Sequence, residues 1–213
     1  MTMTTIDLSK LDTIRLAKGG HANPEAGLCL TEAVAYVCGL THTDHPPCVS
    51  PVLGEYGRSL NDVLSDKRRQ LLKPFIPQLP GTADDGHDET RGYLALDWLI
   101  RTYTPAWLDL AGLSEEARSL RELRRIVDLV AAQQAGPVVR AAQTKAAAAR
   151  AAARAAAGDA AGDAAGDAAG DAAGDAAGDA AGAAAGDVLK PTVDQLQLSA
   201  IDLFGHMIAP AGA

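Results

Sequence analysis

Apolar residues recur at helical spacing along most of the chain. From about Pro24 to Cys38 they lie at positions i, i+3, i+4 and i+7, which predicts a helix capped at its end by Gly39. The apolar stripe of this helix consists of Leu30, Ala33, Val34 and Val37. Ser50 followed by Pro51 is typical of an N-cap and a first helical position, so a second helix is predicted to begin there.

Shorter patterns lie on either side of these two helices. Ile14 and Leu16 alternate with polar residues, which predicts a short strand near the start of the chain. Ser65 caps a brief helix, which we expect the following prolines to stop: Pro74, Pro77 and Pro80. Strong periodicity then predicts helices over 88–102 and over 104–111, the second of them ended by a glycine.

The next predicted helix begins at the N-cap Ser114 and runs to about Gln134. Its expected inward positions are Leu120, Leu123, Val127 and Val130. Its arginines are expected to form a solvated face: Arg118, Arg121, Arg124 and Arg125. Gly136 and Pro137 disfavour helix and are expected to close the domain.

Beyond residue 137 the composition changes to alanine, first with scattered basic residues and then as a Gly-Asp-Ala-Ala repeat from Gly158. Alanine favours helix, but each glycine opposes it by about 1 kcal/mol. We therefore expect a marginal helix or a spacer. A period of four advances each repeat by about 40° around a helix, so no fixed apolar face results and a coiled coil is disfavoured.

Together these patterns predict an all-α protein with three regions. Residues 1–136 form a compact helical domain, 137–187 an alanine-rich helix or spacer, and 188–213 a C-terminal amphipathic helix. The apolar stripe of that last helix either folds back onto the domain or pairs with another copy of the chain.

The charge distribution narrows the classes of partner. The net charge is −8, and residues 155–187 hold seven aspartates without any lysine or arginine. The rest of the chain is nearly balanced, which argues against a nucleic-acid-binding protein. No apolar stretch has the length of a membrane span or the form of a signal peptide, and three cysteines do not pair evenly. We expect a cytoplasmic protein with reduced thiols and no membrane contact.

Histidines and cysteines concentrate in residues 19–51. His42, His45 and Cys48 share one short loop, and His21 or Cys29 could complete a tetrahedral set of the kind that holds structural zinc. The paired halves of common zinc motifs are missing. Solvated histidines and small buried cysteines are therefore the favoured interpretation, with zinc as the alternative cofactor.

The same stretch allows a thiol nucleophile. Cys29 lies near a predicted helix start, where the helix dipole lowers a thiol pKa. His45, beside Asp44, could act as a base, as could His21, and Glu32 could orient either group. A buried structural cysteine is the simpler interpretation, and the sequence leans against an enzyme.

Aromatic residues supply a third hypothesis. They cluster over a short span: Tyr93, Trp98, Tyr103 and Trp107. Exposed tryptophan and tyrosine often anchor protein interfaces. The favoured alternative is that these residues are the few large members of an aliphatic core.

Several ordered segments carry a resemblance. These are GGHANPEAGLCLTEAVAYVCG, HTDHPPCVSPVLGEYGRSLNDVL, RGYLALDWLIRTYTPAWLDLAGL and KPTVDQLQLSAIDLF, the last following the alanine-rich repeat. Together they resemble a group of uncharacterised proteins from actinobacteria and their phages. The resemblance implies a phage or mobile-element origin and no particular activity.

Two functional hypotheses follow. The leading one is a non-enzymatic accessory or protein-interaction protein with an unidentified protein partner. The alternative is a protein with a Cys/His site, either structural zinc or a thiol-dependent hydrolase that uses Cys29.

Overall fold

The structure is a computed structural model that describes residues 6–167 and 171–210, with side chains described for 6–153 and 186–210. Part of the predicted spacer, residues 168–170, and both chain ends lie outside the described residues. The described residues form helices and one isolated bridge, Leu16 with Leu28, without any sheet. The all-α prediction is confirmed.

The chain divides into two compact units. Unit 1 comprises Met1–Ala95 together with Gln197–Ala213, and unit 2 comprises Leu96–Leu196. None of the described helices is long and apolar enough to cross a membrane.

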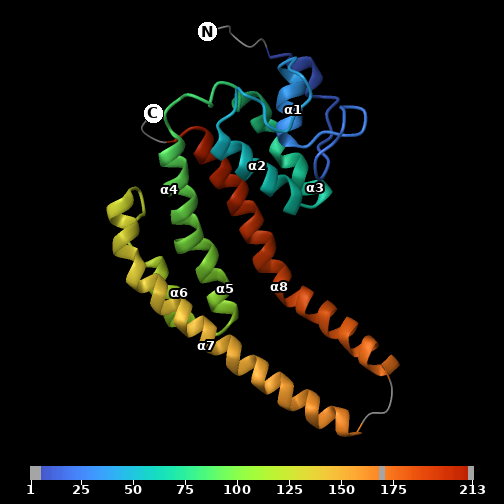
Figure 1. Ribbon diagram of the computed structural model, residues 1–213, viewed down its shortest axis with the longest axis vertical. Coiled ribbons are helices and arrows are strands. Elements are labelled where there is room, and N and C mark those ends of the chain that lie inside the picture. The colour runs from blue at the N-terminus through green and yellow to red at the C-terminus, as the bar shows by residue number, and fades with distance from the viewer. Residues whose placement is uncertain (1–5, 168–170, 211–213) are drawn as a thin grey trace. The chain divides into compact units, whose positions relative to one another are not determined.

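Unit 1 is built from short helices around an aliphatic core, with the C-terminal end of the chain packed among them (Figure 1). Its elements are the 3-10 helix η1 (Leu8–Lys10), α1 (Leu30–Val37), α2 (Pro51–Val63), α3 (Asp66–Arg69), the 3-10 helix η2 (Gln70–Gln78), most of α4 (Asp88–Trp98) and the end of α8 (Asp171–Ile208). Phe204 of α8 is fully buried, and its ring lies 5.8 Å from that of Tyr56 and 5.4 Å from that of Phe75. A Cβ on Gly57 would lie 2.9 Å from Leu30 and 3.1 Å from Phe204, so a larger residue here would require these side chains to shift.

The C-terminal helix folds onto unit 1, which is one of the two predicted alternatives. Most of its predicted apolar stripe is buried, namely Leu196, Ile201, Leu203, Phe204 and Ile208, while Val193 is half-buried. The Tyr56 hydroxyl also donates a hydrogen bond to the Ala200 carbonyl at 3.2 Å. The helix is longer than predicted because it begins at Asp171 and continues through Pro191.

Three predicted helix boundaries in unit 1 and unit 2 are confirmed. Ser50 caps α2 by accepting a hydrogen bond from the Leu53 N–H at 3.2 Å. Gly39 follows α1 with a φ of 64°, and Gly112 follows α5 with a φ of 74°. Both glycines take the left-handed conformation that ends helices.

Three other predictions in unit 1 are wrong. The first helix begins at Leu30, not at Pro24, because residues 23–26 form a turn in which the Asn23 side chain accepts the Ala26 N–H. The prolines at 74 and 77 do not stop the chain but lie within η2, since a proline φ suits a 3-10 turn. The predicted strand at Ile14 and Leu16 is only the isolated bridge.

The centre of unit 1 is a buried arginine that the sequence did not reveal. Arg91 is 0% exposed and is the largest fully buried side chain. Its Nε donates to the Met207 carbonyl of α8 at 2.9 Å, and its terminal nitrogens pair with Asp85 at 2.5 Å and Asp88 at 3.0 Å. The Ser50 hydroxyl donates to the same Asp88 carboxylate. One charge network therefore joins α2, α4, the loop before α4, and α8.

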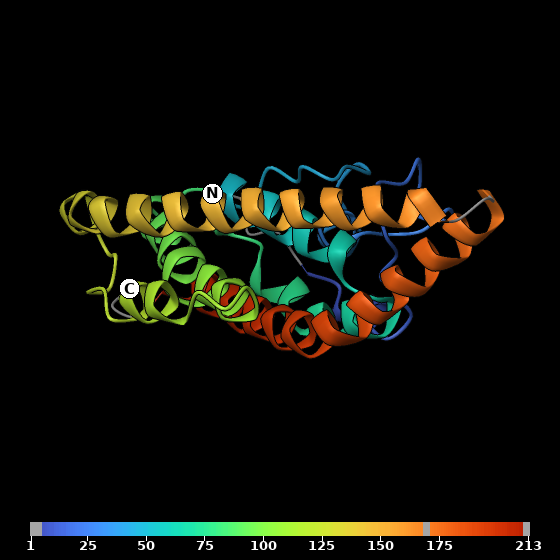
Figure 2. The same cartoon turned by 90° about the horizontal axis from the view of Figure 1, so that it is seen from below.

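Unit 2 begins at the end of α4, and the regular elements among its described residues are all helices. A π-helical turn, η3 (Leu99–Tyr103), is followed by α5 (Thr104–Leu110), α6 (Ser114–Arg121), α7 (Leu129–Asp167) and the first part of α8. A small core joins α5, α6 and α7, formed by Leu108, Ala117, Leu120 and Ala142. Figure 2 shows α7 as one long helix.

The predicted helix from Ser114 to Gln134 is wrong. The helix α6 ends at Arg121, and α7 begins only at Leu129. Between them the Ile126 N–H donates to the Asp97 carboxylate at 2.8 Å, and Ile126 is buried. This tertiary hydrogen bond holds the connection in a non-helical form.

The start of α7 also changes which residues are buried. The Asp128 carboxylate accepts the Ala131 N–H at 2.7 Å, as an N-cap does. Val127 and Val130, predicted to face inward, are exposed instead. Gly136 and Pro137, predicted to close the domain, lie within α7. The four arginines predicted to form a solvated face are exposed as expected.

We predict that Arg91→Met destabilises the protein by about 3–5 kcal/mol, because it leaves two carboxylates and a buried carbonyl without their cation. Urea unfolding followed by circular dichroism measures this free energy. The control is Arg118→Met, since Arg118 forms only an exposed pair with Glu122 at 4.0 Å and should lose less than about 1 kcal/mol. Equal effects of the two substitutions would show that the Arg91 network does not organise the fold.

Candidate functional site

The predicted Cys/His stretch is organised around the Glu32 carboxylate. Glu32 is 2% exposed and lies in the first turn of α1. Its oxygens accept the backbone N–H groups of Cys29 and His21, each at 2.7 Å. The His21 ring nitrogen Nδ1 lies 2.8 Å from Oε2 of the same carboxylate. Glu32 thereby ties the irregular segment before α1 to the helix.

The electrostatics of this cluster favour an ionised Glu32. Burial alone would raise the pKa of Glu32, but the hydrogen bonds from the Cys29 and His21 backbone outweigh it and hold the pKa below its ordinary value. His42 is the second histidine beside this carboxylate, with Nε2 at 3.7 Å from Oε1. The same Nε2 lies 2.8 Å from the His21 carbonyl oxygen.

Glycines close the cluster from the loop side. A Cβ on Gly27 would lie 2.5 Å from the His21 ring, and Gly27 has a φ of 138°. The backbone of this loop therefore lies directly against the imidazole. Gly20 also approaches Glu32, with a Cβ position 3.8 Å from Oε1. The loop backbone thus packs tightly against the His21 ring and lies at van der Waals distance from the Glu32 carboxylate.

Cys29 is placed as a structural residue. It is 2% exposed and is the N-cap of α1, where its side chain and that of Glu32 form a capping box. Burial raises the pKa of the Cys29 thiol and the nearby Glu32 charge adds to the rise, while hydrogen bonds with Thr31 and the Glu32 backbone oppose it only in part. A reactive thiol needs the opposite shift. The arrangement can cap a helix, but it gives little thiolate at neutral pH.

The remaining predicted site residues are not gathered around Cys29. His45 is exposed, and its Nδ1 pairs with the neighbouring Asp44 at 2.7 Å. Cys48 interacts with Cys38, for which the sequence pattern predicts no site role. Burial and the Cys48 thiol raise the pKa of Cys38 to about 11. All three cysteines are free thiols.

The proposed metal ligands therefore fall into separate contacts. His21 and His42 meet Glu32, His45 meets Asp44, and Cys48 meets Cys38. Among the residues whose side chains the structure describes, no three His, Cys, Asp or Glu side chains form a group that could hold a metal ion. The zinc hypothesis gains no ligand set from this arrangement.

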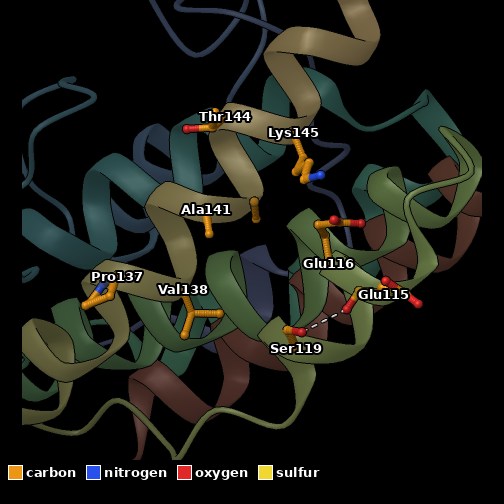
Figure 3. A pocket seen from close by; sticks show the side chains of 9 residues that line it. Glu115, Glu116, Ser119, Pro137, Val138, Ala141, Thr144 and Lys145 are labelled. Carbon is orange, nitrogen blue, oxygen red and sulfur yellow. Dashed lines mark hydrogen bonds between the residues drawn. The ribbon is translucent and has the colours of Figure 1, made fainter.

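A groove of about 700 Å³ lies between α6 and α7 in unit 2. Glu115, Glu116 and Ser119 of α6 line one wall, and the floor and other wall come from Pro137, Val138, Ala141, Ala142, Thr144 and Lys145 of α7. Figure 3 shows Glu116 and Lys145 pointing into the same space from opposite helices. The floor is apolar and made of small side chains, while the rims are charged. Such a groove suits another helix better than a small polar substrate.

Three of the four residues of the predicted aromatic cluster lie in unit 2, while Tyr93 belongs to unit 1. The Trp98 and Tyr103 rings are 5.4 Å apart, and the Tyr103 and Trp107 rings are 6.1 Å apart. Both tryptophans are half-buried and Tyr103 is exposed. These residues therefore form a continuous edge of the unit, not a fully buried core.

Comparison of the chain with protein-family models, with curated proteins and with solved structures gave no match.

We predict that Glu32→Gln lowers the free energy of unfolding by about 1–3 kcal/mol, because an ionised acceptor of several N–H groups is replaced by a neutral one. The folded-state pKa of Glu32 is depressed, so its stabilisation is present above the ordinary carboxyl value of 4.5 and is lost as pH falls. Urea titrations from about pH 3 to pH 6 should therefore show the gap between wild type and variant narrowing on acidification. Glu25→Gln, at an exposed position, is the control and should show no gap.

We also predict slow labelling of Cys29. A variant with Cys38→Ser and Cys48→Ser retains only this thiol, which burial and a raised pKa protect. Its reaction with a chromogenic disulfide at neutral pH should be at least about tenfold slower than that of a small free thiol. Adding urea should abolish the difference. A fast reaction in the native state would support the hydrolase hypothesis.

Proposed function

We propose that this chain is a non-enzymatic protein-interaction protein that binds a partner through the exposed face of α7. The observation that carries the proposal is a seam of exposed residues along the first half of the helix, separated alternately by four and three positions. The seam consists of Val130, Gln134, Pro137, Ala141, Thr144, Ala148 and Ala151. This is the spacing by which one helix packs against another in coiled coils.

The chemistry of the seam supports a protein partner. Val130 is 60% exposed, and its neighbours Val127 and Leu129 are 51% and 60% exposed. Three large aliphatic side chains in four positions form an apolar surface at the start of the seam, which burial against a partner would stabilise. Further along, Ala141 and Ala148 are small enough for two helix backbones to approach closely.

The polar residues of unit 1 support a non-enzymatic protein. Glu32 is occupied by Cys29 and His21, and the Cys29 thiol has a raised pKa. These groups stabilise the segment that precedes α1. The phage or mobile-element origin of such an accessory protein is supported by the sequence resemblance alone.

A photo-crosslinking experiment tests the proposed surface. We predict that benzoylphenylalanine in place of Val130 gives a discrete crosslinked species in cells of the native host. The same group in place of Arg124, which is exposed but lies outside the seam, is the control and should not give that species. Leu129→Asp should reduce the crosslink by removing apolar contact area. Equal crosslinking from positions 124 and 130 would remove the support for α7 as an interaction face.

A further inference from the structure

Among the described side chains of α6, the two arginines form ion pairs, whereas the two glutamates that line the groove do not. Arg118 pairs with Glu122 at 4.0 Å, and Arg121 pairs with Asp109 at 2.5 Å. Within residues 6–153 and 186–210, no ion pair engages Glu115 or Glu116. Among the described side chains, the two carboxylates of the α6 wall therefore form no salt bridge.

The first half of α7 has the complementary composition. Residues 138–153 contain three basic side chains, no acidic one, and mostly alanine otherwise. Those basic residues are Arg140, Lys145 and Arg150. Lys145 lines the same groove from the α7 wall, opposite Glu115 and Glu116 of α6, and it has no ion-pair partner among the described side chains. The chain itself thus contains a helix of small, basic character that matches an acidic groove with a small apolar floor.

We infer that the groove is filled by α7 of a second copy of this chain, with the two α7 helices antiparallel along their seams. This inference rests on the proposed function, since it names the partner of the α7 face. Each Lys145 then meets Glu115 and Glu116 of the other copy, so the contact is the same in both directions, as a two-fold interface requires.

The antiparallel arrangement follows from where the charges lie. Position 145 lies about 140° around the helix from position 140, on the flank nearest α6. A two-fold axis that reverses the helix direction keeps the two α6 flanks on the same side of the pair. Lys145 of one copy then faces the acidic wall of the other. A parallel pair would place Lys145 opposite Arg140, which like-charge repulsion disfavours.

The seam makes the close approach feasible. Its central positions are Ala141, Thr144 and Ala148, which are all exposed and small. Small residues at the contact bring helix axes toward the short end of the usual 8–10 Å range. At that separation a lysine side chain can span from its own helix to the neighbouring α6.

Charge-reversal substitutions in the full-length protein test the inference. Sedimentation velocity of the wild type over a concentration series at low salt should show a reversible monomer–dimer equilibrium, weakened by added salt. Lys145→Glu and the double variant Glu115→Lys/Glu116→Lys should each weaken dimerisation by at least about tenfold. An equimolar mixture of the two variants should restore association to within about threefold of wild type, because every swapped charge then meets its opposite.

Two controls separate the inference from other outcomes. Lys67→Glu changes an exposed lysine of unit 1 by the same charge and should leave dimerisation unchanged. Circular dichroism of each variant shows whether it remains folded, and Lys145→Ala provides a milder change at the same position. The inference would be overturned if the wild type is monomeric, or if the mixture of the two variants associates no more strongly than either variant alone.

A dimer that neither swap affects would place self-association on another surface, such as the C-terminal helix, and would also overturn it. A monomeric protein that still crosslinks from position 130 to a different protein would overturn the inference and leave the proposed function supported. Loss of both dimerisation and crosslinking would contradict the inference and the proposed function alike.

Discussion

Unit 1 depends on the burial of one guanidinium. Arg91 is removed from water, and an unpaired buried cation is strongly unfavourable, so the fold must supply its hydrogen-bond partners from several places. The Asp85 and Asp88 carboxylates and the Thr82 carbonyl come from the segment just before Arg91, and the fourth partner is the Met207 carbonyl, 116 residues further along the chain. Because that carbonyl belongs to the C-terminal helix, the charge is satisfied only when the end of the chain has returned to the beginning. The buried ion network therefore makes unit 1 discontinuous in sequence. It also explains why the apolar stripe of α8 lies against α2, with Phe204 beside Tyr56.

A smaller version of the same constraint organises the segment before α1. That segment has little regular secondary structure, so its backbone N–H groups need other acceptors. The Glu32 carboxylate supplies them for Cys29 and His21 and binds the His21 ring as well. Side chains that would suit catalysis or metal binding by type are thus used to stabilise a loop. Residue type alone does not distinguish these uses, because a buried carboxylate with a histidine partner can serve either. The distinction comes from the number of backbone donors on the carboxylate and from the raised pKa of the Cys29 thiol.

Local signals in the sequence were sufficient for the fold class and for several boundaries, while tertiary contacts decided the rest. Helix caps act within a few residues of their positions, so the effect of Ser50, Gly39 and Gly112 on the backbone can be predicted from the sequence. The break between α6 and α7 is not, because it depends on Asp97 accepting the Ile126 N–H from 29 positions away. Asp128 caps α7 and is a local signal for a new helix start, but the apolar periodicity across this segment favours one continuous helix. Arg91 and the pairing of Cys38 with Cys48 likewise depend on contacts between segments. For the candidate site, the sequence grouped Cys29 and Glu32 with His45, and with His21 only as an alternative base. The structure brings Cys29, Glu32 and His21 together in a capping role and leaves His45 paired with Asp44.

The break at residues 122–128 has a consequence for function. Because α6 is short and α7 is long, α6 covers only one side of the first turns of α7 and leaves the seam from Val130 to Ala151 exposed. The seam follows a seven-residue period, which keeps it on one face of a helix that pairs with another. From Gly158 the sequence changes to a period of four, and a four-residue pattern advances about 40° per repeat. A heptad interface therefore cannot continue into the repeat with constant composition. The change of period limits any helix-pairing face to the part of α7 before the repeat, which is also the part that carries basic residues beside an acidic groove.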